Sequence, residues 1–214
     1  MKVISLNVSN LKEIPWDGKM IQTGIFKEPV TKALEVKGIN IVGDDQGNRK
    51  THGGPDRVVY SYAMEYYDYW NKQYPNKNLP FGMFGENLTT EGLFENKIQI
   101  GDIFKIGTAE IMAVQPRMPC YRLGIKFDDQ KVIDKYLETD YCGIFYKVVK
   151  EGKIKSHDEI KLVKNDPESM TIVEIYHLMQ EKGNRETVQK ALKLEHLPDK
   201  LKVRFQQLLE TKTT

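Results

Sequence analysis

Gln115-Pro116-Arg117-Met118-Pro119-Cys120 closes a predicted β-strand over 109–114 with a stiff loop that carries a thiol. Each proline fixes its own φ and pushes the preceding residue toward extended backbone, so the loop is not helical. Arg117 and Arg122 lie close to the cysteine in sequence. Cationic neighbours favour the thiolate, which attacks electrophiles and binds soft metals. The alternative interpretation is a small residue buried at a turn.

Short strands separated by Gly, Pro, Asn and Asp extend over the first three quarters of the chain. The candidate strands span 2–8, 20–25, 31–37, 57–61, 97–106, 109–114, 143–149 and 159–163. This pattern is typical of an antiparallel barrel or sandwich, so the sequence predicts a mainly β fold with a few peripheral helices. The helices are expected at 61–74 and 131–138. In the first, an aromatic stripe at helical spacing is expected to pack in the core rather than stack on nucleic-acid bases. The stripe comprises Tyr62, Tyr66, Tyr69 and Trp70.

The pattern changes near Lys164, so the sequence predicts a β domain over 1–163 and a small three-helix domain over 164–214. Asp166 is the expected cap of the first helix, with Pro167 at its first position. Amphipathic segments follow at 167–182, 185–195 and 198–211. Three helices also suit a DNA-binding helix-turn-helix. Residues 164–214 hold nine Lys+Arg and eight Asp+Glu, a net of +1. This balance favours a packing or partner-docking unit over nucleic-acid binding.

The composition argues against several classes of protein, among them polyanion-binding, disulfide-rich and membrane proteins. With 214 residues and 40% apolar content the chain can bury a sizeable core. Lys+Arg 32 against Asp+Glu 30 indicates no polyanion-binding surface. Two cysteines are too few for a disulfide framework or a four-thiolate iron–sulfur cluster. The amino terminus lacks a secretory signal and no apolar run approaches the roughly 20 residues that span a bilayer, so we expect a cytoplasmic protein without membrane association.

Two further polar, glycine-bearing segments lie far from Cys120 in sequence. They are His52-Gly53-Gly54-Pro55-Asp56-Arg57 and Phe84-Gly85-Glu86-Asn87-Leu88-Thr89-Thr90. Loops that project from one β scaffold can meet at one pocket, and we expect these two segments to meet the Cys120 loop there.

These segments, together with Gly101-Asp102-Ile103-Phe104 and in this order, resemble the MOSC family, the domain found at the carboxyl end of molybdenum cofactor sulfurases. The resemblance is strongest to stand-alone bacterial YiiM-type members and spans nearly the whole chain. It implies a MOSC-type β-barrel over about 2–163 and a three-helix extension over about 166–211. It also implies a molybdenum–pterin cofactor whose metal is ligated by the residue at Cys120. Similar proteins reduce N-hydroxylated compounds, including hydroxylamino purines and amidoximes, with electrons from a separate reductase.

The residue types agree with that implied role. A thiolate is the soft ligand among the candidates, whereas His52 and Glu86 offer harder donors. An anionic cofactor needs guanidinium, ammonium and backbone N–H donors, and Gly53 permits close backbone approach. The expected cofactor-binding residues are Thr23, Lys27, His52, Gly53, Arg57, Glu86, Asn87 and Arg117.

Structural roles remain as alternatives. In these alternatives Arg57 pairs with Asp56, Thr23 caps a turn and Asn87 bonds the backbone of its own loop. His52 is expected either to deliver a proton, since its unperturbed pKa lies near neutral, or to order the Gly-Gly loop. Cys142 is expected to be a buried small hydrophobe, and a redox partnership with Cys120 stays open.

The leading functional hypothesis is a molybdenum-dependent oxidoreductase that cleaves N–O bonds in small N-hydroxylated substrates, with Cys120 and His52 as catalytic residues. An external flavin or iron–sulfur protein is the expected electron donor, because the chain has no dinucleotide-binding fingerprint. A homodimer is a further expectation. The alternative is a carrier of the cofactor, or of sulfur as a Cys120 persulfide, without turnover of its own.

Overall fold

A curled eight-stranded sheet forms the body of the protein in the computed structural model, which describes residues 1–47 and 53–211. Its strand order is β13-β9-β10-β11-β7-β8-β1-β4, and every pairing is antiparallel except β7 with β8. The strands are β1 (Lys2–Val8), β4 (Glu28–Val30), β7 (Val59–Ala63), β8 (Leu88–Glu91), β9 (Ile103–Ile106), β10 (Ala109–Pro116), β11 (Ile144–Lys150) and β13 (Ile160–Lys164).

The predicted closed barrel is not confirmed, because the sheet remains open. β4 and β13 form its two edges. The start of β1 does approach the segment before β13 through one bridge, Lys2 with Glu159, and a backbone bond of 2.9 Å from Val3 N–H to the Asp158 carbonyl. The sheet therefore curls until β1, the neighbour of edge strand β4, touches the segment before β13, without a continuous ladder between them.

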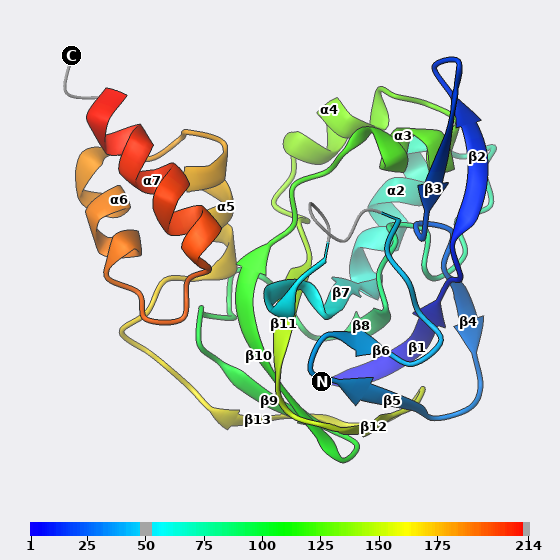
Figure 1. Ribbon diagram of the computed structural model, residues 1–214, viewed down its shortest axis with the longest axis horizontal. Helices are drawn as coiled ribbons and strands as arrows, with labels where there is room; N and C mark the ends of the chain where they lie inside the picture. Colours follow the sequence, from blue (N-terminus) through cyan, green and yellow to red (C-terminus); the bar gives the residue numbers. More distant parts are fainter. Residues whose placement is uncertain (48–52, 212–214) are drawn as a thin grey trace.

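Two small sheets flank the large one (Figure 1). The hairpin of β2 (Lys12–Trp16) and β3 (Lys19–Thr23) projects from one side of the molecule. β12 (Gly152–Ile154), β5 (Leu34–Lys37) and β6 (Asn40–Ile41) form the other. Five strands lie outside those expected from sequence: β2, β4, β6, β8 and β12. The expected strand 97–106 is a strand only over β9.

The aromatic segment 61–74 is only partly helical. Its first residues complete β7, followed by a 3-10 turn η2 (Met64–Tyr66) and helix α2 (Tyr67–Gln73). A further turn, η1 (Pro55–Arg57), precedes β7. Tyr62 and Trp70 are fully buried, and the indole N–H donates to the Tyr62 hydroxyl at 2.7 Å. The expectation of core packing is thus confirmed for these two rings, while the helix boundary was wrong.

Helix α3 (Tyr121–Phe127) begins directly after Cys120 and was not expected from sequence. Helix α4 (Val132–Leu137) matches the second expected helix. Gly124 lets α3 pack closely against Gln130, because a side chain at Gly124 would overlap the Gln130 amide.

The carboxyl-terminal helices α5 (Ile172–Met179), α6 (Arg185–Leu192) and α7 (Asp199–Thr211) gather on the side opposite the β2–β3 hairpin (Figure 1). The first begins later than predicted: Thr171 is its N-cap in a capping box with Glu174, and the Asp166 N–H instead donates to Asp102. Helix α5 packs against β10, and the Tyr176 hydroxyl donates to the Tyr136 carbonyl at 3.3 Å. No helix within the described residues has the length and apolar character needed to cross a membrane.

Candidate functional site

A cleft of about 590 Å³, measured out to open solvent, lies where the end of β3, strands β7 and β11 and the start of α3 meet. The lining residues are Thr23, Gly24, Ile25, Lys27, Asp45, Gln46, Gly47, Tyr60, Gly85, Asn87, Arg117, Cys120, Arg122 and Phe145. Five predicted site residues therefore meet at one place: Thr23, Lys27, Asn87, Arg117 and Cys120.

Cys120 presents its thiol to this cleft from a half-buried position. Its extended backbone, with φ −135° and ψ 166°, makes it the residue that caps the start of α3. Its carbonyl accepts from the Leu123 N–H at 2.8 Å, which anchors the residue to the first helical turn. The thiol is thus held between the proline-stiffened loop and a helix.

Arg117 lines the same cleft and interacts electrostatically with Cys120. Its side chain is nine-tenths buried, donates to the Phe84 carbonyl and lies 4.9 Å over the Tyr60 ring. Burial lowers its pKa, but the surrounding hydroxyl and thiol groups, Cys120 among them, raise it more, so the net direction is upward. The guanidinium remains charged and adds positive potential around the sulfur.

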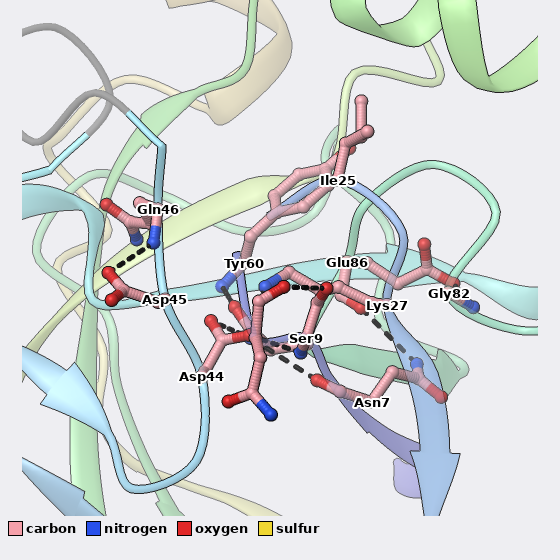
Figure 2. Close-up of polar contacts among 12 residues, drawn as sticks. Asn7, Ser9, Ile25, Lys27, Asp44, Asp45, Gln46, Tyr60, Gly82 and Glu86 are labelled. Atoms are coloured by element: carbon pink, nitrogen blue, oxygen red, sulfur yellow. Dashed lines mark hydrogen bonds and ion pairs between the residues drawn. The ribbon is translucent and has the colours of Figure 1, made fainter. Parts of the chain in front are cut away.

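A buried polar network centred on Asp44 supports one wall of the cleft (Figure 2). Its carboxylate accepts from the Lys27 ammonium at 2.5 Å, the Ser9 N–H at 2.9 Å and the Asn87 amide at 2.9 Å. The Asn87 oxygen in turn accepts from the Tyr60 N–H at 3.1 Å. Lys27 and Asn87 thus face the cleft with their polar groups already engaged below it, and their cofactor-binding roles stay predictions.

Glu86 is fully buried under the same wall and is not among the lining residues. Its carboxylate accepts from the Gly82 N–H at 2.6 Å, the Phe84 N–H at 3.0 Å and the Tyr67 hydroxyl at 2.6 Å. These bonds hold the loop that carries Gly85 into the cleft. The observed contacts are therefore structural ones.

Thr23, Arg57 and Gly53 occupy different positions. The Thr23 hydroxyl is buried and accepts from the Ile25 N–H at 3.3 Å, a local turn contact. Arg57 lies beside the cleft, 5.7 Å from the centre of the Phe145 ring, and donates weakly to Gln115 at 3.5 Å. Burial lowers the pKa of Arg57. Gly53 lines a neighbouring hollow that shares Asp45 and Gln46 with the cleft.

The other histidines and the second cysteine lie elsewhere. His52 falls outside the described residues, so its predicted roles are not tested. His177 contacts Asp140 at 2.7 Å on the helical side. Cys142 is fully buried, and burial raises the pKa of its thiol well above the usual range. Neither cysteine forms a disulfide with a described residue, and the core packing expected of Cys142 is confirmed.

Sequence reasoning missed several residues at the site. The segment Asp45-Gln46-Gly47 packs its backbone directly on the end of β3, where side chains at Gly24 or Gly47 would overlap opposing backbone atoms. Glycines flanking acidic residues in Gly43-Asp44-Asp45-Gln46-Gly47 were the available signal.

Lys126, at the end of α3, was also missed. Its ammonium donates to the Ile25 carbonyl at 2.8 Å and to the Gly82 carbonyl at 2.6 Å. Burial, opposed by the Glu86 carboxylate, lowers its pKa to about 7. Lys126 therefore ties two walls of the cleft to the helix that begins at Cys120.

The donor set fits a group whose metal takes one protein ligand. Across residues 1–47 and 53–211 no three or more His, Cys, Asp and Glu side chains gather as a metal site. Among the residues that line the cleft, Cys120 is the sulfur donor, and Arg122 places a buried Nε without a hydrogen-bond partner at the same cleft. A thiolate with surrounding cations suits an anionic cofactor that carries a soft-ligated metal.

Comparison with known proteins identifies relatives of this chain. The MOSC domain profile matches residues 48–161. YflK of Bacillus subtilis is 35% identical over 170 residues, covering 79% of this chain and 76% of that protein. YiiM of Escherichia coli is 38% identical over 143 residues, covering 66% and 64%. The crystal structure of YiiM from Geobacillus stearothermophilus superposes with a TM-score of 0.81 at 26% identity, over 97% and 98% of the two chains. The chain therefore belongs to the MOSC domain family.

Proposed function

We propose that the protein is a molybdenum-cofactor-dependent reductase of small N-hydroxylated compounds, with Cys120 as the protein ligand of the metal. The observation that carries the proposal is the convergence of the half-buried Cys120 thiol, Arg117 and the Thr23–Lys27 wall on one cleft. Membership in the MOSC family supports a molybdenum-cofactor-associated role. A relative from Gibberella moniliformis bears the name "Reductase"; it is 26% identical over 166 residues, 29% of its length.

The reaction breaks the N–O bond, consumes two electrons and two protons, and releases the amine and water. The bound cofactor would supply the two-electron, oxygen-accepting chemistry. This chain's residues hold it: the Cys120 sulfur anchors the metal end, and the buried guanidinium of Arg117 offsets negative charge beside it. Tyr60 and Phe145 form apolar walls of the cleft and limit access of water.

Electrons are expected from a separate flavin or iron–sulfur protein, because two cysteines cannot hold a four-thiolate cluster. Protons must come from groups at the cleft, and His52 stays the predicted donor. N-hydroxylated nucleobases are the substrates we would test first.

The direct test is an assay of molybdenum-loaded protein with an artificial electron donor and 6-hydroxylaminopurine. We expect formation of adenine by wild type, loss of turnover in Cys120→Ala and near-normal turnover in Cys142→Ala, whose side chain lies in the core. Absence of turnover by loaded wild-type protein contradicts the proposal and favours a carrier of the cofactor or of sulfur.

A further inference from the structure

The cations of the cleft differ in what they bind. Lys27 pairs with Asp44, Arg117 donates to the Phe84 carbonyl, and Lys126, behind the wall, donates to the carbonyls of Ile25 and Gly82. Arg57, beside the cleft, donates to Gln115. Each of these groups has protein partners that fix it in place. None of them needs a ligand to satisfy its charge.

Arg122 is different. It lines the cleft with Cys120, and its Nε is buried without a hydrogen-bond partner. In the part of the chain that the structure describes, no hydrogen bond or ion pair engages its guanidinium. What it does contact is aromatic: the guanidinium lies 4.8 Å from the centre of the Tyr121 ring.

Stacking orients this guanidinium. Tyr121 is itself stacked on Trp16, with ring centroids 5.7 Å apart and planes 23° apart. Trp16 belongs to the β2–β3 hairpin, while Tyr121 opens α3, so two separate elements build the aromatic support. An aromatic face attracts a guanidinium but leaves its in-plane N–H groups free to donate.

A buried, unpaired donor on a charged group costs free energy, and native structures rarely keep one without a reason such as an absent ligand. The group that best satisfies a guanidinium fork is an oxyanion, which accepts two parallel hydrogen bonds. Arg122 follows Cys120 by two residues in the first turn of α3, so such an oxyanion would lie near the thiol.

We propose that Arg122, held by the Tyr121–Trp16 stack, binds an oxyanion of the ligand in the cleft beside Cys120. The oxyanion is a phosphate or a carboxylate-type group, carried either by the cofactor or by the substrate. The inference rests on the proposed function only in placing a ligand in this cleft; it does not depend on the redox reaction.

The first experiment needs no molybdenum. The chain has six arginines, so Nε–H signals of ¹⁵N-labelled protein are few enough to follow individually. Titration with inorganic phosphate, and separately with acetate, is expected to shift the Arg122 Nε–H signal saturably. Arg122→Gln is expected to weaken binding by about tenfold or more, because a charge-assisted bond is worth about 1.5–3 kcal/mol. Arg122→Lys keeps the charge but loses the fork, so we expect an intermediate affinity.

Arg185→Gln, on the exposed start of α6, is the matched control and should bind like wild type. Because a local substitution can disturb the fold, each variant is first compared with wild type by its thermal unfolding midpoint. No saturable shift of the Arg122 signal, or equal anion affinity in wild type and Arg122→Gln, overturns the inference.

A second pair of measurements shows whether the cofactor or the substrate carries the oxyanion. If the cofactor carries the oxyanion, Arg122→Gln purified from a cofactor-competent host contains less pterin and molybdenum than wild type. If the substrate carries it, cofactor content is unchanged while KM rises for N-hydroxylated substrates with a carboxylate and not for neutral ones. If Arg122→Gln changes neither the cofactor content nor the KM for carboxylate substrates, the inference is overturned. Inactive wild-type protein with intact anion binding would contradict the proposed function alone.

Discussion

Two cysteines of this chain occupy opposite environments. Cys120 lies half-buried at a cleft, while Cys142 is sealed in the core, where burial raises the pKa of its thiol. Alkylation of native, cofactor-free protein should therefore modify one thiol per chain, and both only after unfolding. The measurement is the mass of the intact protein after treatment with iodoacetamide. Cys120→Ala should abolish native labelling and Cys142→Ala should not; rapid labelling of Cys142 would show that the core assignment is wrong.

Asp44 is the residue on which the cleft wall most depends. Its buried carboxylate neutralises Lys27, whose side chain is also buried. Asp44→Asn leaves that ammonium without a counter-charge, and we expect a loss of about 3–5 kcal/mol in the free energy of unfolding. Urea denaturation measures it.

The matched control for Asp44 is an exposed pair with similar chemistry. The Lys12 ammonium and the Glu28 carboxylate lie 2.9 Å apart on the surface, so Glu28→Gln should leave the free energy of unfolding nearly unchanged. Equal effects of the two substitutions would mean that the Asp44–Lys27 pair does not stabilise the wall as described.

The sequence predicted the residues that face the cleft better than those that support it. Cys120, Arg117, Thr23, Lys27 and Asn87 were expected together and do line one cleft. Asp44 was not expected, because its partners Ser9, Lys27 and Asn87 are 35, 17 and 43 residues away in sequence. A carboxylate satisfied by such distant partners carries no local pattern.

At the level of elements, the cleft depends on close backbone packing between β3 and the segment 45–47. A Cβ at Gly47 would lie 2.8 Å from the Thr23 Cα and overlap the Gln22 carbonyl, so Gly47→Ala forces β3 to move. We expect a loss of about 1–3 kcal/mol in unfolding free energy and weaker ligand binding in the cleft. Thermal unfolding measures the first effect.

Gly38→Ala is the comparison for this substitution. The Cβ there meets only the Glu151 carboxylate, at an ordinary 3.7 Å, so it should be close to neutral. If Gly47→Ala is equally well tolerated, the backbone contact between these segments is looser than described.

Elements with a strong local pattern were predicted and those without one were missed. β1, β10, β11, β13 and the three terminal helices follow apolar periodicity and lie near their expected positions. α3 was missed because YRLGIKF combines a glycine with two aromatic residues and one β-branched residue, which favour helices weakly. β8 was expected as a loop, although its parallel pairing with β7 makes Thr89 and Thr90 part of the sheet.

Across the whole molecule, a buried carboxylate lies where the sheet meets the carboxyl-terminal helices. Glu95 accepts from the Tyr66 hydroxyl at 2.5 Å and the Gly143 N–H at 2.6 Å, and its carbonyl accepts from Val173 at the start of α5. Burial raises the pKa of this carboxyl to about 7, although the two donors oppose the shift. Between pH 4.5 and 7 the folded protein therefore keeps a proton on Glu95, whereas the unfolded chain, with a pKa near 4.5, has released it.

Stability contributed by that proton is present below pH 4.5 and is lost as pH rises through about 7. The measurement is urea denaturation of wild type and Glu95→Gln at pH 5 and at pH 8. From pH 5 to pH 8 we expect the free energy of unfolding of wild type to fall by up to about 3 kcal/mol more than that of the variant. Parallel pH dependence of the two proteins would show that Glu95 does not titrate in this range.

The mainly β fold class was predicted from the sequence, but the open state of the large sheet was not. Short strands and turns are visible in the sequence, whereas whether β4 and β13 join depends on strand register and curl, which no local segment encodes. The division at residue 164 stays a prediction, since α5 both begins the helical unit and packs against β10.

The central claim is that the Cys120 sulfur ligates the metal of a cofactor held in this cleft. Its most direct test is the molybdenum content per chain of wild type, Cys120→Ala and Cys142→Ala, each purified from a cofactor-competent host. We predict that wild type and Cys142→Ala retain molybdenum in similar amounts and that Cys120→Ala loses most of it. Equal molybdenum in Cys120→Ala and wild type would contradict the claim.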